Sequence, residues 1–341
     1  MSEISSLRSS SPSFLTDEMQ MIPAIWPMPS QTMQGHTESI KCVVHLTDGQ
    51  QIITCSWDGS LRRWDLGSGT QIGDDWRDEG NNTGVLTMAL SPNSKTFASG
   101  SEDGTVKLWD VKTGEVIARW TEHTQNVESV CWSPNGERVL SGSWDGTVGV
   151  WGVGNGEIIL GPIKTEQQQV FAVAYSPDGS NFATGGFYGV KTWDGSTGDL
   201  LSTLEHRSTV WSLAWTSDGK KLISGLWNGS IEIVDTVTLQ QIAVLQGHTI
   251  AVTAITLSCN GRVLASTSWD YTARLWDLET NCQVGPSLRH EKYVRCAAFS
   301  ADGTRLVTGC DDTNAYMWDV GAILKEHHLE HLLPISDVSV K

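Results

Sequence analysis

The chain has 341 residues, of which 23 are Lys or Arg and 39 are Asp or Glu, so its formal net charge is −16. This charge opposes nonspecific attraction to nucleic acid and to anionic membranes and mildly favours basic partners. The seven cysteines are odd in number and include no Cys-x-x-Cys pair, which favours small buried thiols in a reducing compartment over a disulfide framework.

The N-terminal segment is serine-rich and lacks the uninterrupted apolar run that a signal peptide or a membrane span requires. We expect residues 1–23 to form a flexible tail, and we expect a cytoplasmic or nuclear protein that is not secreted. Residues 29–36 come next and end in Gln34-Gly35-His36, much as residues 243–248 end in Gln246-Gly247-His248. This similarity predicts an outer strand that precedes the first complete repeat.

A short ending, Trp-Asp or a degraded form of it, then recurs seven times. The steps between neighbouring copies are 45, 42, 42, 41, 42 and 42 residues, which matches the interval of about 40 to 45 residues for a four-stranded propeller blade. The copies are Trp64-Asp65, Trp109-Asp110, Trp151-Gly152, Trp193-Asp194, Val234-Asp235, Trp276-Asp277 and Trp318-Asp319.

Each unit presents its signals in the same order, and the third unit shows them clearly. His123 precedes apolar runs over 127–132, 138–143 and 147–151, which are separated by turn residues. Short β-rich runs divided by such turns are typical of a meander of strands. We therefore predict an all-β, seven-bladed propeller over residues 24–320. Because the pattern stops after a third strand at Trp318, we expect the N-terminal outer strand to complete the last blade and to remove open sheet edges.

These repeats resemble the WD40 (β-transducin-like) family of propellers over about residues 30 to 320. The resemblance implies that His, Ser or Thr, Asp and Trp form a hydrogen-bonded tetrad in each blade. An indole N–H only donates, a hydroxyl donates and accepts, and a neutral imidazole links the hydroxyl to a carboxylate, so the buried set satisfies itself. Four complete sets match by spacing: His36, Thr54, Asp58 and Trp64; His123, Ser141, Asp145 and Trp151; His248, Ser266, Asp270 and Trp276; His290, Thr308, Asp312 and Trp318.

Three blades depart from the tetrad, and we expect apolar packing to hold them more than the polar set does. The second has Asn81 in place of His, the fifth keeps His206 and Ser224 but has Asn228 and Val234, and the fourth has Glu166 in place of His and Phe187-Tyr188-Gly189 as its turn.

The sequence predicts no catalytic residue, no metal site and no cofactor. A Gly-x-Ser-x-Gly elbow and a Gly-Lys-Ser/Thr phosphate loop are both missing, and His290-Glu291 is followed by Val294 where a zinc protease needs its second His. The Ser, His and Asp of the tetrads recur four times, whereas a catalytic triad occurs once in a cleft. We therefore interpret them as structural.

The resemblance also implies a binding face at the channel entrance, where many family members bind peptides. The residue before the turn Asp and the third and fifth residues after the His project there. The fifth-after-His class is Lys41, Leu86, Glu128, Phe171, Trp211, Thr253 and Arg295. Aromatic and Arg side chains are frequent interface anchors, although such aromatics can instead pack between blades. The candidate partner-binding residues are Trp57, Trp144, Phe171, Phe187, Trp211, Trp227, Trp269, Tyr293 and Arg295.

We therefore expect a noncatalytic protein-interaction scaffold, or an adaptor subunit of a larger complex, that binds other proteins or peptides through this face. One alternative is a reader of basic or modified peptides, in which Phe187, Trp211 and Trp227 cage a methylated Lys. A remote alternative is an enzyme at the channel mouth, which would need a single cluster of titratable residues outside the repeat pattern. The oligomeric state is left open.

Two further segments are candidates for contacts. Residues 74–79 are acidic around Trp76 and form either a grip for a basic segment or an ordinary solvated loop. In the C-terminal region, 321–341, we expect a short amphipathic helix over 322–333. Its His327 and His331 would share a face, but two ligands do not make a metal site, and its Leu face would dock on the propeller or on a partner.

Overall fold

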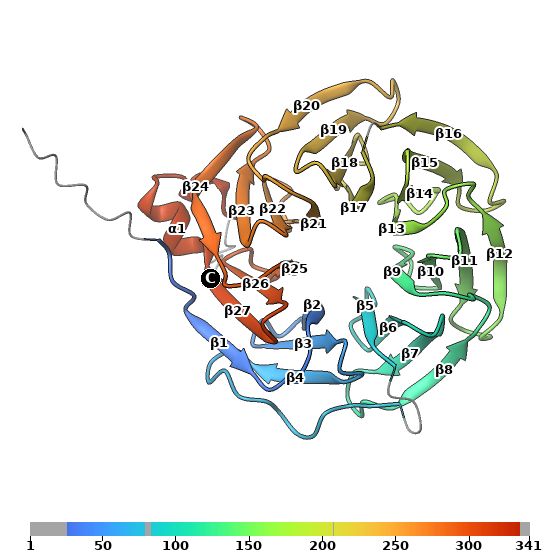
Figure 1. The fold of residues 1–341 in the computed structure, drawn as a ribbon, viewed down its shortest axis with the longest axis horizontal. Helices are drawn as coiled ribbons and strands as arrows, with labels where there is room; N and C mark the ends of the chain where they lie inside the picture. Colours follow the sequence, from blue (N-terminus) through green and yellow to red (C-terminus); the bar gives the residue numbers. More distant parts are fainter. Residues whose placement is uncertain (1–25, 79–82, 207, 335–341) are drawn as a thin grey trace, which may run out of the picture.

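The computed structural model describes residues 26–78, 83–206 and 208–334. Seven sheets stand in a ring around a central channel (Figure 1), which confirms the seven-bladed β-propeller. The expected tail over 1–23 and Asn81 lie outside the described residues.

Each blade is an antiparallel meander whose innermost strand lines the channel (Figure 1). The first three blades contain, from the channel outward, β2 (Ile40–His45), β3 (Gln51–Ser56) and β4 (Leu61–Asp65); β5 (Val85–Leu90), β6 (Thr96–Ser101), β7 (Val106–Asp110) and β8 (Val116–Trp120); and β9 (Val127–Trp132), β10 (Arg138–Ser143), β11 (Thr147–Gly152) and β12 (Ile158–Lys164).

The remaining blades follow the same order. They contain β13 (Val170–Tyr175), β14 (Asn181–Gly186), β15 (Gly189–Asp194) and β16 (Leu200–Glu205); β17 (Val210–Trp215), β18 (Lys221–Leu226), β19 (Ile231–Asp235) and β20 (Gln241–Leu245); β21 (Val252–Leu257), β22 (Val263–Ser268), β23 (Thr272–Asp277) and β24 (Cys282–Arg289); and β25 (Val294–Phe299), β26 (Arg305–Cys310), β27 (Asn314–Asp319) and β1 (Gln31–Gln34).

The fourth strand of blade 7 comes from the other end of the chain. β1 pairs antiparallel with β27, from Gln31 opposite Met317 to Gln34 opposite Asn314. Met33 is fully buried in a cluster with Met317 and Trp64. This strand therefore contributes apolar packing as well as ladder hydrogen bonds to the junction between the last blade and the first.

Blade 1 has three strands, and the acidic segment lies where its fourth would be. Isolated bridges form there in place of a strand, and one of them joins Leu61 to Trp76. The Trp76 ring stacks on Phe97 of blade 2, with centroids 6.1 Å apart. The Asp75 carboxylate accepts from Arg77 Nε at 2.8 Å, and Asp78 pairs with Lys107 at 3.0 Å. Trp76 and these carboxylates thus make their contacts within the protein, at the outer edge of blade 1.

The C-terminal region differs from the single helix expected over 322–333. Helix α1 (Val320–Glu326) begins at the Asp319 carboxylate, which accepts from the Ala322 N–H at 2.8 Å. The chain leaves the helix because His328 adopts a left-handed φ of 58°, and a separate 3-10 turn, η1 (Glu330–Leu332), follows.

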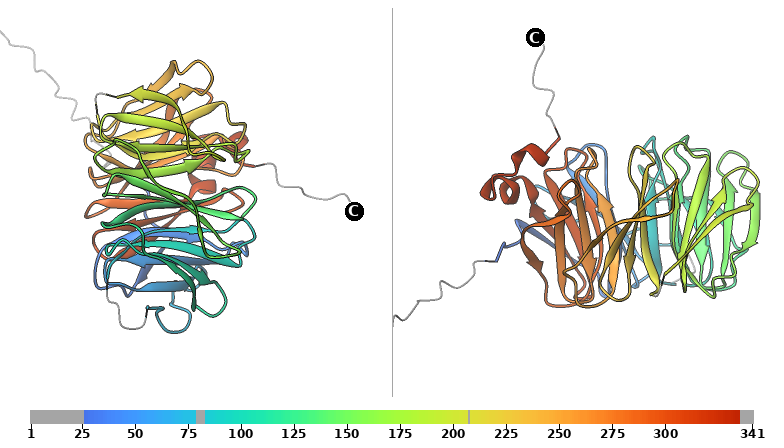
Figure 2. Two further views of the ribbon diagram at one scale, coloured as in Figure 1. Left: turned by 90° about the vertical axis from the view of Figure 1, so that its right-hand side faces the viewer. Right: turned by 90° about the horizontal axis from the view of Figure 1, so that it is seen from above.

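His327 and His331 consequently do not share one helix face, so that expectation is wrong. Leu324 and Leu332 are buried in a cluster with residues of blades 6 and 7. The apolar side of this region thus docks on the propeller, outside the ring (Figure 2).

Candidate functional site

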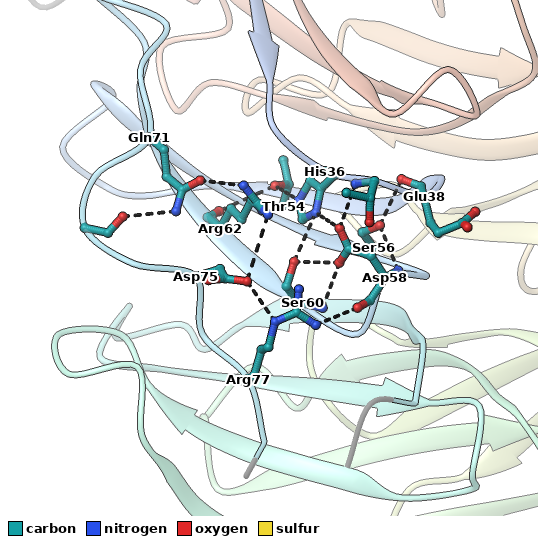
Figure 3. Close-up of polar contacts among 12 residues, drawn as sticks. His36, Glu38, Thr54, Ser56, Asp58, Ser60, Arg62, Gln71, Asp75 and Arg77 are labelled. Atoms are coloured by element: carbon teal, nitrogen blue, oxygen red, sulfur yellow. Dashed lines mark hydrogen bonds and ion pairs between the residues drawn. The ribbon is translucent and has the colours of Figure 1, made fainter. Parts of the chain in front are cut away.

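The polar set of blade 1 is a continuous hydrogen-bonded chain. Asp58 Oδ2 lies 2.9 Å from His36 Nδ1, and His36 Nε2 lies 2.8 Å from Thr54 Oγ1 (Figure 3). The Trp64 indole N–H donates to the same hydroxyl at 2.8 Å. Burial is the largest influence on His36 and lowers its pKa, against the hydrogen bond to Asp58. The neutral imidazole can therefore link hydroxyl to carboxylate.

Blades 3 and 6 repeat this arrangement. In blade 6, His248 lies 2.8 Å from Asp270 and 2.7 Å from Ser266, and Trp276 donates to Ser266 at 2.8 Å. Burial alone would raise the pKa of Asp270, but the His248 hydrogen bond and charge and the Thr272 hydrogen bond outweigh it and lower that pKa to about 2. In blade 3 the corresponding contacts join His123, Asp145, Ser141 and Trp151.

Blade 7 departs from the expected tetrad at one bond. His290 contacts Thr308 at 2.8 Å, and Trp318 donates to Thr308 at 3.0 Å. The Asp312 carboxylate, however, accepts from the Tyr316 hydroxyl at 2.6 Å, and His290 Nδ1 lies 3.2 Å from the Leu288 carbonyl. The assignment of Asp312 as the partner of His290 is therefore wrong, because a phenol within reach competes for the carboxylate.

Blade 4 builds its polar set from a residue that the spacing did not indicate. Gln167, not the exposed Glu166, occupies the place of the His. Its Oε1 accepts from the Thr184 hydroxyl at 2.7 Å, and Trp193 donates to Thr184 at 3.0 Å. Because an amide both donates and accepts, Gln167 also donates to the Gly189 carbonyl at 2.8 Å. Apolar packing is therefore not the only support of this blade.

In blade 5 the histidine is retained but its partners are changed. His206 Nδ1 lies 2.9 Å from Glu232, and among the described residues its buried Nε2 has no hydrogen-bond partner.

The predicted binding residues lie at one end of the ring. Within an antiparallel meander, the turn between the second and third strands and the loop that leads to the next blade share one end, and the two remaining turns share the other. The aromatic side chains there form one connected cluster. Phe171 stacks on Trp211 at 4.6 Å, Trp211 meets Trp227 at 5.7 Å, and Trp227 meets Trp269 at 4.9 Å.

The cluster extends in both directions. Phe171 also contacts Trp144 and Phe187, and Trp269 contacts Tyr293. Trp57 stands apart, with Lys41 over its ring and its indole N–H donating to Glu102 at 3.3 Å. We call the connected group the aromatic face: Trp144, Phe171, Phe187, Trp211, Trp227, Trp269 and Tyr293.

Exposure divides the aromatic face into supporting and accessible rings. Trp227 and Tyr293 are 44% and 37% exposed, whereas Phe171 is 6% exposed. Phe171 therefore supports Trp211 rather than offering a large contact area of its own.

Two further tyrosines border the aromatic face, and the sequence analysis missed them. Tyr188 and Tyr271 occupy left-handed turn positions, with φ of 69° and 67°, where Gly59 and Gly104 stand in other blades. They are 69% and 47% exposed, and Tyr271 stacks on Tyr293 at 5.4 Å. A side chain in this conformation costs of order 1–3 kcal/mol, and such strain gathers at functional sites. A tyrosine where the repeat has glycine is the signal that could have identified them.

Three indoles of the aromatic face have buried N–H groups without an acceptor among the described residues. They belong to Trp144, Trp211 and Trp269. A buried unpaired donor costs about 1–3 kcal/mol, and such groups in native structures are rare. The aromatic face is thus apolar and holds three buried indole donors that no described residue satisfies.

The fifth-after-His residues line the neck of the channel, around a space of about 80 Å³. Burial lowers the pKa of Lys41 and raises that of Glu128, so both groups are harder to charge than in water. The Arg295 guanidinium donates to both oxygens of Asp311 at 2.7 Å. The structure therefore gathers this class of residues at the channel, and three of its members, Lys41, Glu128 and Arg295, carry ionisable groups.

No group of three or more His, Cys, Asp or Glu side chains suited to a metal ion is found within residues 26–78, 83–206 and 208–334. Across the same ranges, no helix is long and apolar enough to cross a membrane.

Comparisons with known proteins place the chain among propellers. The model described as "IFT122 first beta-propeller" matches residues 78–319, and that described as "WD domain, G-beta repeat" matches residues 28–65. The chain is 28% identical over 224 residues to Autophagy-related protein 16 of Arabidopsis thaliana, which covers 61% of this chain and 42% of that protein.

In two other relatives the match covers a smaller share of this chain and of the relative's own length. Periodic tryptophan protein 2 homolog of Dictyostelium discoideum is 25% identical over 243 residues, 57% of this chain and 26% of that protein. Eukaryotic translation initiation factor 3 subunit I of Aspergillus niger is 34% identical over 88 residues, which cover 26% of this chain and 25% of that protein. The chain thus spans less than half the length of each of these three relatives.

Proposed function

Since the chain belongs to the WD40-repeat β-propellers, in the family described as IFT122 first beta-propeller, we propose that it is a noncatalytic protein-interaction scaffold or an adaptor subunit of a larger complex. We place its partner-binding site on the aromatic face. One of its relatives is a subunit of a eukaryotic translation initiation factor, which supports a role within an assembly.

The observation that carries the proposal is the set of three unpaired indole donors on a connected aromatic surface. The indole N–H groups of Trp144, Trp211 and Trp269 are buried, so these rings would rotate on binding to donate to main-chain carbonyls of a bound peptide segment. Apolar side chains of that segment would cover the exposed Trp227 and Tyr293. Each indole that gains an acceptor removes a desolvation cost of about 1–3 kcal/mol. The energy of binding would thus be concentrated in a few aromatic anchors.

The two alternatives are less well supported. A methyl-lysine cage needs ring faces open to the cation, but Trp211 stacks on Phe171, and Phe187 contacts Phe171 and Tyr188. An enzyme site at the channel mouth would have to use the neck, whose space of about 80 Å³ is well below the roughly 300–1,000 Å³ of ligand pockets. A preference for basic segments rests on the overall charge alone.

We also propose a cytosolic or nuclear location. All seven cysteines are free in the structure, which suits a reducing compartment.

The proposal is tested by removing the three donors while the rings stay. A variant with Trp144→Phe, Trp211→Phe and Trp269→Phe is compared with wild type by affinity capture and quantitative mass spectrometry. Ile117→Ala serves as control, because Ile117 is 54% exposed on β8, outside the aromatic face.

We expect at least one partner to fall about tenfold, equivalent to 1.4 kcal/mol, with the triple variant and to be retained by the control. An unchanged set of partners at unchanged abundance would exclude the aromatic face. Circular dichroism verifies that both variants are folded.

A further inference from the structure

Tryptophan fills the space between neighbouring blades at six of the seven repeat endings. Trp193 of blade 4, for example, is buried in a cluster with Val148, Val150 and Leu160 of blade 3. Blade 5 is the exception, since Val234 occupies this place. The interface between blades 4 and 5 therefore has a smaller side chain where the others have an indole.

On the blade 4 side of this interface the side chains are also small. In blades 2, 3, 5 and 6 the residue before the repeat ending packs against the Trp of the next blade, and these residues are Leu108, Val150, Ile233 and Leu275. In blade 4 the same position is Thr192, whose hydroxyl pairs with that of Ser202 at 2.7 Å. Small polar side chains thus face the small Val234.

A groove opens at this interface, with a volume of about 740 Å³. Trp215, Thr192, Ser202 and Leu239 line it and also line a narrow apolar pocket of about 10 Å³ beside it, which reaches Val234. The groove is bounded by the turn between β13 and β14 and by the turn between β19 and β20. Both turns lie at the end of the blades opposite the aromatic face, so the groove is a separate site.

The rim of the groove is apolar and acidic. Leu201 is 54% and Val237 88% exposed, and the charged residues among the described lining are Asp178 and Asp218. Hydrogen bonds from Ser176 and from Thr216, respectively, are the largest influence on these carboxyls and lower their pKa values, so both are ionised at neutral pH. Lys220 stands next to Asp218 but does not line the groove.

We propose that the groove between blades 4 and 5 binds an extended segment of a partner protein that carries a Leu, Ile or Met side chain next to Lys or Arg. The aliphatic side chain would lie on Trp215 with its tip toward the narrow pocket, because a space of about 10 Å³ holds roughly one water-sized group. The cationic side chain would meet Asp178 and Asp218, which complement it in charge. This site is independent of the aromatic face, so either proposal can fail alone.

The probe for the test is a phage-displayed library of random peptides of about twelve residues, selected on the full-length protein and counterselected on Val234→Trp. That substitution places in blade 5 the residue of the other six blades and fills the narrow pocket. We expect enrichment of Leu, Ile or Met beside Lys or Arg. An enriched peptide, labelled with fluorescein, should lose about tenfold in affinity, or 1.4 kcal/mol, against Val234→Trp and against Asp178→Asn with Asp218→Asn.

Two controls keep the result interpretable. Val237→Glu changes an exposed rim residue, so it should weaken binding without disturbing the core, even if Val234→Trp misfolds. Trp227→Ala on the aromatic face should leave the peptide affinity unchanged.

The proposal is overturned if no sequence is enriched, or if the enriched peptides bind all groove variants equally. It is also overturned if peptides bind only after deletion of residues 1–20, which would make the chain's own N-terminal segment the occupant. If the protein self-associates and Val234→Trp abolishes this, the occupant of the groove is a second copy of the chain, which also overturns the proposal.

Discussion

Replacing His248 by Ala tests whether the buried polar chain of blade 6 stabilises the fold. The His248 side chain is fully buried and lies within hydrogen-bond distance of Asp270 and Ser266. Without it, the Ser266 hydroxyl still accepts from Trp276 but loses the acceptor for its own proton. Asp270 loses its imidazole donor and keeps its donors from Thr249 and Thr272.

The cost follows from these two losses. A stranded buried hydroxyl costs about 1–3 kcal/mol, and a hydrogen bond to a charged group contributes about 1.5–3 kcal/mol. Because Asp270 keeps three donors, the Thr249 N–H and the N–H and hydroxyl of Thr272, we expect His248→Ala to lower the free energy of unfolding by about 3 kcal/mol, apart from the cavity that the ring leaves.

His206→Ala is the matched control, since His206 holds the same repeat position with a side chain that is 3% exposed. Its Nε2 is unpaired, and its bond to Glu232 reaches a carboxylate that is 21% exposed, so that pair contributes at most about 1 kcal/mol. The cavity is similar in both variants. The difference between them, about 2 kcal/mol or more, therefore measures the polar chain alone.

The assay is urea unfolding followed by far-ultraviolet circular dichroism, with the midpoints compared at equal slope. Thermal unfolding gives a second measure, in which we expect His248→Ala to melt about 4 °C or more below His206→Ala. Equal destabilisation of the two variants would show that packing, and not the hydrogen-bonded chain, accounts for the effect of His248, and would refute this reasoning.

Two other predictions concern pH and the N-terminal strand. Burial is the largest influence on three buried imidazoles, lowering the pKa of His290 to about 4 and those of His36 and His248 below the ordinary 6.5. Between these pKa values the unfolded chain binds more protons than the folded one, so acid favours unfolding. The stability that the neutral imidazoles contribute is therefore fully present above pH 6.5 and is lost as the pH falls toward 4. A melting temperature that is no lower at about pH 5 than at pH 7.5 would contradict this prediction. Deletion of residues 1–20 should leave the melting temperature unchanged, whereas deletion of 1–35 removes β1 and the buried Met33 and exposes β27 as an edge, so a soluble product with unchanged melting would refute the role of that strand.

The sequence by itself determined the number of blades and the order of the strands within a blade. The interval of about 42 residues repeats one supersecondary unit, and a repeat is detected without any knowledge of long-range contacts. The tetrads of blades 1, 3 and 6 follow the same spacing. The aromatic residues around the channel entrance could also be selected from their repeat positions.

Individual hydrogen bonds could not be predicted from the sequence where neighbouring side chains compete for the same partner. Spacing assigned Asp312 to His290 and Glu166 to the position of His, but Tyr316 takes the carboxylate and Gln167 takes the polar position. Hydrogen-bond partners depend on which donors and acceptors arrive within about 3 Å, and spacing along the chain does not specify that.

Only the tertiary structure decided which surfaces are available to a partner. The three unpaired indoles, the charged neck and the groove beside Val234 each require side chains from two or more blades. Val234 is one departure in the sequence, and the narrow pocket that it lines is left open because Thr192 and Ser202, on the neighbouring blade, are small as well. A local sequence pattern specifies each blade. The space between two blades depends on how well the side chains of both surfaces fit together, and this fit is decided only when the ring is assembled.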